Sequence, residues 1–294
     1  MTTAPGNPTK GILLVVGATV FFALADTVTK HLTTLYPVSI VMLLRYAVNV
    51  ALMLVFLYPT QRAALWHTRR TQLVTLRALC LCAGSLTMAM ALRVMPVGET
   101  VAIVYLSPFL VMLLAAPLLG ERVSMTGWIG AAMGFTGVLL IVHPGGGLDR
   151  LGVVLSLINA GFATAYHLLT RLLARTETTY GLLFNTAAVG VIVFALLSIG
   201  QWHGPMPGAS DIGLMLLLGV LMTGGHYLFT SAYREAPASL LAPITYLHLL
   251  WAGGFGWLIF NHIPDQMALT GMALVMIAGI AIALRARFAP PIVE

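Results

Sequence analysis

The residues of this chain that could do chemistry are ionisable side chains within long apolar stretches. Asp26 and Lys30 lie four residues apart, with the acid on the amino-terminal side, which is the favoured order for an ion pair on a helix. Two interpretations stay open. The pair is either a structural one that neutralises itself, or its charges meet the charged ends of a substrate, with Asp26 as a possible carrier of a coupled proton.

Three histidines, His167, His226 and His248, also fall inside apolar segments. Imidazole titrates near neutral pH, so proton transfer is one role for them, and a hydrogen bond between packed helices is the alternative. The sequence has no His-x-x-x-His motif and no Cys/His cluster, so we expect no metal site. Cys80 and Cys82 are two residues apart on one predicted helix and point to different faces.

Aromatic and hydroxyl side chains suggest the kind of substrate. Tyr105 and Tyr246 each lie close to a proline, which frees a backbone carbonyl and bends a helix. A largely apolar cavity with a few polar groups would suit a zwitterion with a large apolar side chain; ordinary packing is the alternative. The predicted substrate-binding residues are Asp26, Lys30, Ser85, Met88, Tyr105, Asn159, Phe162, Tyr166, His167, His226, Tyr246 and His248, with Tyr227 and Trp251 nearby. The predicted hinge residues are Pro108, Pro243, Gly224 and Gly225.

Composition determines the solvent that these residues see. Apolar residues make up 59% of the 294 residues, charged residues only 8%, and the mean hydropathy is +0.95. Soluble domains carry roughly 25% charged residues, so the chain is expected to be an integral membrane protein. The net charge of +6 is spread over many loops and forms no patch, so we expect no nucleic-acid partner. No cleavable signal peptide is expected, because the first apolar segment is of full span length.

Ten apolar segments are long enough to span a bilayer, each bounded by Pro, Gly or charged residues. They are expected at about 11–32, 37–57, 73–93, 97–118, 127–143, 150–171, 180–199, 211–232, 239–260 and 267–286. Lys and Arg gather in the loops that face the cytoplasm if the amino terminus lies inside. Both termini are therefore predicted to be cytoplasmic, in a bacterial-type inner membrane.

The chain repeats itself at an offset of 141 residues. Arg93, Pro96 and Tyr105 correspond to Arg234, Pro237 and Tyr246. This constant offset indicates a duplication, with repeats at 1–144 and 145–294. Five spans is an odd number, so the second repeat must be inverted in the membrane. We therefore predict an all-α membrane protein of ten transmembrane helices in two inverted five-helix repeats, an architecture typical of alternating-access carriers.

The run Pro96, Tyr105-Leu-Ser-Pro108 and Gly120-Glu121-Arg122, followed by a glycine-rich segment, resembles the EamA repeat of the drug/metabolite transporter superfamily. Two such repeats match over essentially the full length. Among bacterial members the chain most resembles the YddG-type amino-acid exporters. The second repeat departs from the pattern, because Asn261-His262 stands where the first has Gly120-Glu121.

Two other features have structural interpretations. Gly127, Gly130, Gly134 and Gly137, together with Gly271 and Gly279 in the last segment, predict small helix faces for close packing or self-association. Arg77, near the cytoplasmic end of its segment, is interpreted as an anchor at the membrane interface.

The function predicted from these features is export of aromatic or other large neutral amino acids by alternating access. The alternative is export of another small amphipathic metabolite or drug. An enzyme would need a nucleophile and base or metal ligands, and a pore would need rings of like charge, and neither pattern stands out. No cofactor is expected, whether a proton is coupled stays open, and the partners expected are a small-molecule substrate and lipid, with monomer and homodimer both open.

Overall fold

The protein is described here by a computed structural model, in residues 7–119, 125–143, 147–173, 176–201, 207–236 and 238–288. In these ranges every regular element is a helix. The chain forms two compact units. Unit 1 comprises residues 1–24, 97–148 and 224–294, and unit 2 comprises residues 25–96 and 149–223, so each unit takes segments from both predicted repeats.

Two long helices are shared between the units, α1 (Pro8–Leu35) and α9 (Ala209–Glu235). Unit 1 otherwise contains α4 (Val97–Val104), α5 (Ser107–Leu119), α6 (Met125–Ile141), α10 (Ala238–Thr245), α11 (Leu247–Phe260) and α12 (Gln266–Phe288). Unit 2 otherwise contains α2 (Val38–Gln61), the 3₁₀ turn Arg62–Leu65, α3 (Thr71–Val94), α7 (Arg150–Leu173) and α8 (Thr179–Ser198).

The prediction of an all-helical membrane protein is confirmed. Within the described ranges, eight helical segments are long and apolar enough to cross a bilayer. The apolar parts of α6 and α12, Gly127–Ile141 and Gln266–Ile282, are shorter. The count of ten spans therefore stays a prediction, although a helix or a pair of helices covers each predicted segment.

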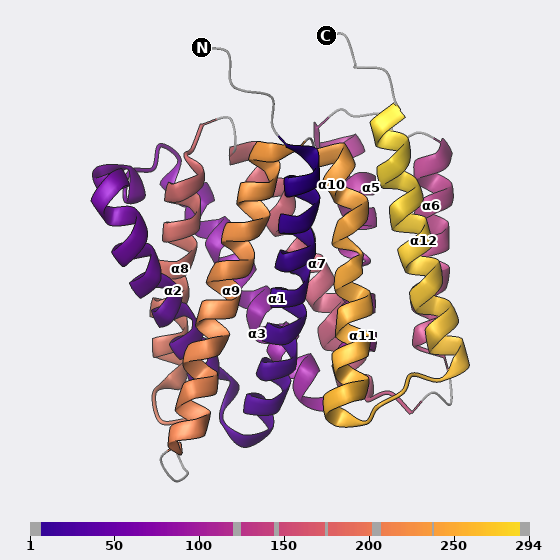
Figure 1. Cartoon of the computed structure of the whole chain (residues 1–294), viewed down its shortest axis with the longest axis horizontal. Coiled ribbons are helices and arrows are strands. Elements are labelled where there is room, and N and C mark those ends of the chain that lie inside the picture. Colours follow the sequence, from indigo (N-terminus) through magenta and orange to yellow (C-terminus); the bar gives the residue numbers. More distant parts are fainter. Residues whose placement is uncertain are drawn as a thin grey trace. The chain divides into compact units, whose positions relative to one another are not determined.

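In unit 1, α6 packs against α12, and the two helices run side by side in Figure 1. Their backbones meet at Gly137 and Gly271, where a Cβ on either residue would contact the carbonyl of the other. Gly130 makes room for Ile282, and Gly134 lies against the ring of Phe109. The predicted role of these glycines in helix packing is confirmed, since the absence of Cβ atoms permits this close approach.

In unit 2, α3 packs against α7 and α8, and α2 packs against α8. Gly190 on α8 lies against the ring of Tyr46, which also stacks on Phe194 at a centroid distance of 5.4 Å. At one end of the unit, the Tyr36 hydroxyl donates a 2.6 Å hydrogen bond to Asp211 at the start of α9. This bond to a carboxylate raises the pKa of Tyr36.

Short polar residues determine where several helices begin. Asp149 accepts a hydrogen bond from the Gly152 amide at 2.8 Å before α7, and Asp265 accepts one from Ala268 at 2.8 Å before α12. Thr178 does the same for Gly181 at 3.1 Å before α8. Such caps satisfy amide groups that have no partner within the helix, and thereby set the entry of each span.

Candidate substrate-binding site

Two membrane segments in unit 1 are broken near their middle. The first breaks at Tyr105 and Leu106, between α4 and α5, and the second at Tyr246, between α10 and α11. At the breaks the regular hydrogen bonds give way to three-residue ones, such as Leu106 amide to Ile103 carbonyl at 3.0 Å and Leu249 amide to Tyr246 carbonyl at 3.1 Å. Pro108 and Pro243, which cannot donate such bonds, lie beside them.

The two tyrosines at these breaks lie together. Their ring centroids are 5.0 Å apart, and the Tyr105 hydroxyl donates a 2.7 Å hydrogen bond to the Thr245 carbonyl, the last residue of α10. The same hydroxyl is 3.4 Å from Nδ1 of His248. A broken helix exposes backbone carbonyls that must find donors, and at this break a tyrosine from the repeat mate supplies one.

An aromatic cluster continues from this pair within unit 1. The ring of Phe22 on α1 lies edge to face against two imidazoles. Its centroid is 6.2 Å from that of His248 and 5.1 Å from that of His226. The structure therefore brings together four of the predicted binding residues, Tyr105, Tyr246, His226 and His248. We call these four residues and Phe22 the aromatic cluster. Aromatic rings, imidazoles and hydroxyls are the kinds of groups that bind amphipathic molecules.

The remaining predicted binding residues belong to unit 2, and several of them already have protein partners. Ser85 shares a 2.8 Å hydrogen bond with the Tyr46 hydroxyl, and Asn159 donates a 2.5 Å hydrogen bond to the Gly84 carbonyl. Both Ser85 and Asn159 are buried. Met88 and Phe162 are half-buried. Tyr227, at 69% exposure, and Trp251, at 36%, are exposed and belong to unit 1.

Arg77 on α3 is bonded to residues of α7 and α8 within unit 2, and its predicted place as an interface anchor is wrong. Its side chain is buried, with 3% of the residue exposed. It donates to the Tyr166 hydroxyl at 2.7 Å, to Thr170 at 2.7 Å, to Thr186 at 2.9 Å and to the Leu182 carbonyl at 3.2 Å. Its guanidinium also lies 4.3 Å from the Tyr166 ring centroid. The sequence placed Arg77 by its distance from the segment end, which says nothing about which face of α3 is covered.

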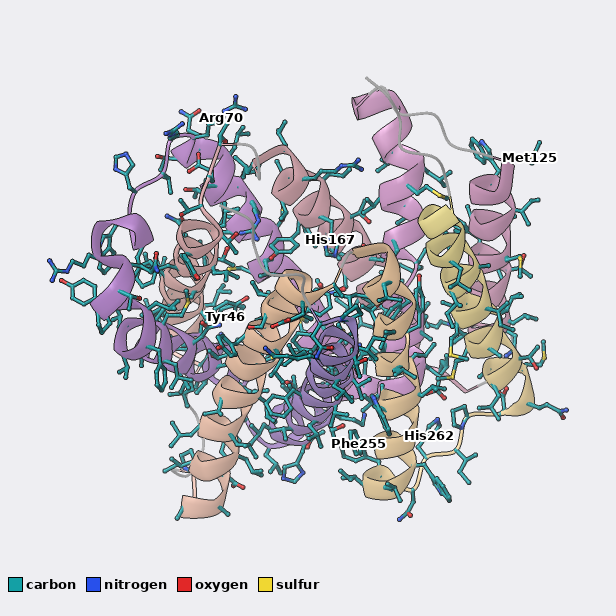
Figure 2. All side chains as sticks on the ribbon, turned by 45° about the horizontal axis from the view of Figure 1, so that its top comes forward. Tyr46, Arg70, Met125, His167, Phe255 and His262 are labelled. Atoms are coloured by element: carbon teal, nitrogen blue, oxygen red, sulfur yellow. The ribbon has the colours of Figure 1, made fainter. Side chains whose placement is uncertain are left out.

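His167, labelled in Figure 2, is the residue after Tyr166 on α7, and the centroids of the two rings are 5.4 Å apart. Tyr166 and His167 are thus brought together beside Arg77.

Lys30 donates to the carbonyls of Leu92 at 2.9 Å and Met95 at 2.6 Å, at the carboxyl end of α3. A cation at this end of a helix stabilises its terminal carbonyls. Asp26 is half-buried and lies on α1, the helix that carries Lys30.

The predicted hinge glycines lie in a continuous helix. Gly224 and Gly225 are inside α9, where an added Cβ would come 2.8 Å from the Phe21 ring and 2.7 Å from the Phe22 ring. Close packing of phenylalanine is therefore a second reason for glycine at both positions. Their role as hinges stays a prediction, as does that of the two prolines.

Two hollows in the described residues lie elsewhere. One, of about 780 Å³, lies at the end of unit 2 beside Tyr36 and Arg93, and the other, of about 540 Å³, is an apolar groove between α11 and α12. None of the predicted binding residues lines either one.

Sequence reasoning did not name Phe22 of the aromatic cluster, nor Glu99 on α4. Glu99 is 2% exposed, and its Oε1 lies 2.7 Å from Nε2 of His262. Glu99 is an acid within an apolar segment, which is a sufficient signal for a functional candidate. The partner could not be found from the sequence, because His262 is 163 residues away.

Comparison with known proteins identifies the class. The model of the EamA-like transporter family matches residues 9–143 and again 150–285. The chain belongs to this family, as a multi-pass membrane protein with two EamA repeats.

Individual relatives are all distant. The chain is 25% identical to the pseudopaline exporter CntI of Pseudomonas aeruginosa over 93% of this chain and 95% of that protein. It is 28% identical to a riboflavin transporter of Rhizobium johnstonii, covering 96% of this chain and 93% of the relative. A solved crystal structure at 20% identity covers 96% of both chains with a TM-score of 0.61, which supports the fold alone. The resemblance to drug/metabolite transporters is thereby confirmed, and a role in transport is supported.

Proposed function

We propose that this chain is a secondary transporter that exports aromatic or other large neutral amino acids from the cytoplasm. The alternative is another small amphipathic metabolite. The observation that carries the proposal is the aromatic cluster at two broken helices. Ring faces would hold a large apolar side chain, and carbonyl groups freed at the breaks would bind an ammonium group.

The proposed mechanism is alternating access between two inverted repeats, 1–144 and 145–294, with both termini in the cytoplasm. The three-residue hydrogen bonds at Tyr105–Leu106 and at Tyr246 are weaker than regular helical ones, so α4/α5 and α10/α11 would bend there. Pro108 and Pro243 would keep these two breaks flexible, and Gly224 and Gly225 would let α9 bend at the same time. Asp26, Lys30, Ser85, Met88, Asn159, Phe162, Tyr166 and His167, all in unit 2, stay predicted as substrate-binding residues.

Riboflavin is a second candidate substrate, because relatives over nearly the full length are named riboflavin transporters. Riboflavin also carries a large aromatic ring system, which would stack on tyrosine and histidine. The riboflavin and amino-acid hypotheses differ in the charged groups of the ligand. An amino acid needs sites for an ammonium and a carboxylate, and riboflavin needs neither.

The test is counterflow of labelled phenylalanine, tryptophan, methionine and riboflavin in proteoliposomes of the purified protein. We expect saturable exchange of one class, weakened or altered in selectivity by Tyr105→Ala and Tyr246→Ala. Tyr227→Ala is the matched control, since that tyrosine is 69% exposed and lies outside the cluster. Wild-type exchange in both cluster variants would remove the aromatic cluster from the site. Exchange of neither class by the folded protein would move the proposal to another metabolite.

A further inference from the structure

Glu99 is a buried carboxyl group that the proposed transport cycle does not use. Its Oε1 lies 2.7 Å from His262, whereas its Oε2 is buried and has no hydrogen-bond partner among the residues that the structure describes. A buried carboxylate oxygen without a partner is costly, and native structures contain few of them. Such an atom points to something that binds there during function.

The backbone brings His262 to this place. Asn261 ends α11 in the left-handed conformation, with φ of 53°, which asparagine tolerates better than most residues. The Asn261 amide bonds to the Trp257 carbonyl at 2.9 Å, and the turn places His262 beyond the helix end, as Figure 2 shows. Asn261-His262 stands where the first repeat has Gly120-Glu121. This change of sequence supplies an imidazole partner for Glu99.

His262 differs from Glu99 in its access to water. The His262 side chain is 39% exposed, and that of Glu99 is 2% exposed. One ring nitrogen contacts the buried acid while the ring itself reaches solvent. Imidazole accepts and releases protons near neutral pH, so this geometry forms a short path between water and the carboxyl group.

We propose that Glu99 and His262 form a proton-binding site, in which His262 passes the proton on Nε2 to Oε1 of Glu99, 2.7 Å away, and takes up a proton from water on its other ring nitrogen. Protonation turns the carboxylate into a neutral acid, which removes the cost of a buried charge. A proton needs one oxygen atom, whereas a metal ion needs several ligands. In the described ranges no three His, Cys, Asp or Glu side chains are grouped to hold a metal ion.

Among the described helices, α6, α11 and α12 pack on α4, and other titratable groups lie on or next to them. After α6 comes His143, whose Nε2 lies 3.5 Å from Asp265, the residue before α12. On α11 the other imidazole is His248, which belongs to the aromatic cluster. The His143–Asp265 pair has an exposed acid, with 45% of its side chain accessible, and so lacks the burial that distinguishes Glu99.

The site is placed to act on the helices that carry the aromatic cluster. Gly98, next to Glu99, packs directly on α11, since an added Cβ would lie 3.1 Å from the Gly253 Cα. The helix α4 ends at Val104, just before the first break, and α11 begins at Leu247, just after the second. A change in charge at Glu99 would therefore act on helices that adjoin both breaks. This coupling rests on the proposed transport function, whereas proton binding itself does not.

Proton binding is tested without any substrate, by infrared difference spectroscopy of the purified protein between about pH 5 and 8. We expect the carbonyl band of a protonated carboxyl group to appear as the pH falls and to be absent in Glu99→Gln. His262→Gln, a change at a half-exposed position, should shift the pH at which the band appears. Asp265→Asn is the matched control and should keep the band. A band that survives in Glu99→Gln, or one that does not change with pH, overturns the proposal.

Coupling is tested in proteoliposomes that carry a pH gradient. We expect Glu99→Gln to lose the stimulation of substrate uptake by the gradient and to keep counterflow, while Asp265→Asn keeps both. Full stimulation in Glu99→Gln, or uptake driven by sodium alone, would overturn a coupled proton at this site. If the wild type moves no substrate, the transport proposal fails, and the infrared result still decides whether Glu99 binds the proton.

Discussion

Arg77 in unit 2 and Glu99 in unit 1 are equally buried, with 3% and 2% of each residue exposed, yet their surroundings differ. Arg77 is held by four hydrogen bonds to neutral oxygens. Glu99 has one bonded oxygen and one without a partner in the described residues. Burial alone therefore does not distinguish a structural charge from a functional one. The satisfaction of each polar atom does, because a fully bonded group has no capacity left for a ligand.

The helices of the two units also differ, in whether they are continuous. In unit 2, α3, α7 and α8 run without a break through their spans and are joined by Arg77. In unit 1, two segments break at Tyr105–Leu106 and Tyr246. We infer that unit 2 is the firmer frame and that unit 1 is the part that bends.

The largest effect is expected from Arg77→Met in unit 2. It would leave acceptors on α7 and α8 without a donor, so we expect a loss of about 3 kcal/mol in stability, since hydrogen bonds to charged groups are strong. The thermal unfolding temperature in detergent would report this loss. Arg77→Lys is the control that keeps the charge but not the planar array of donors, and should recover only part of the stability. Wild-type stability of Arg77→Met would show that Arg77 does not hold the frame.

Gly279→Ala in unit 1 should have the next largest effect. An added Cβ would overlap the ring of Tyr246, so this ring must shift and its packing on Tyr105 must change. Overpacking of this kind costs about 2 kcal/mol, and substrate selectivity should change with it.

Gly254→Ala on α11 is the matched control, because an added Cβ there meets nothing within 4 Å. It should be neutral or stabilise the helix by up to about 1 kcal/mol. Equal unfolding temperatures and equal transport for the two alanine variants would contradict the tight placement of Tyr246.

The helices could be predicted from the sequence because membrane segments are specified locally. Segments predicted at 150–171 and 180–199 correspond to α7 at Arg150–Leu173 and α8 at Thr179–Ser198. A run of apolar residues between Pro, Gly and charges suffices for this, since each segment satisfies its own backbone. The duplication likewise placed Tyr105 and Tyr246 at equivalent positions.

The partners of polar side chains could not be predicted in the same way. Arg77 binds residues about 90 to 110 positions away, and Glu99 binds one 163 positions away. These contacts depend on which helix faces meet, which span periodicity leaves undetermined in segments that are apolar all round. The same limit explains why Ser85 and Asn159 could be named as polar groups without their partners, Tyr46 and Gly84.

Tyr105→Phe tests the difference between the two units with a smaller change. It removes the hydroxyl that donates to the Thr245 carbonyl at 2.7 Å while keeping the ring. We expect about 1 kcal/mol of lost stability, and a change in substrate affinity with little change in selectivity for aromatic compounds. Tyr46→Phe in unit 2 removes a comparable hydroxyl bond, to Ser85, and should change substrate affinity less than Tyr105→Phe does. Similar affinity changes in both variants would contradict a special role for unit 1.

The smallest effect is expected at the surface of unit 1, where Lys10 binds Glu235 at 2.5 Å. The Lys10 hydrogen bond, together with that from the Asn7 amide, lowers the pKa of Glu235. A lowered pKa means that the bond stabilises the folded state above the ordinary glutamate pKa, and that this contribution is lost as the pH falls through the lowered value. The unfolding temperatures of wild type and Glu235→Gln should therefore differ slightly at neutral pH and low salt, and converge in acid. High salt should also remove the difference, because both side chains reach solvent. A difference that grows in acid would show that the carboxylate is not the stabilising form.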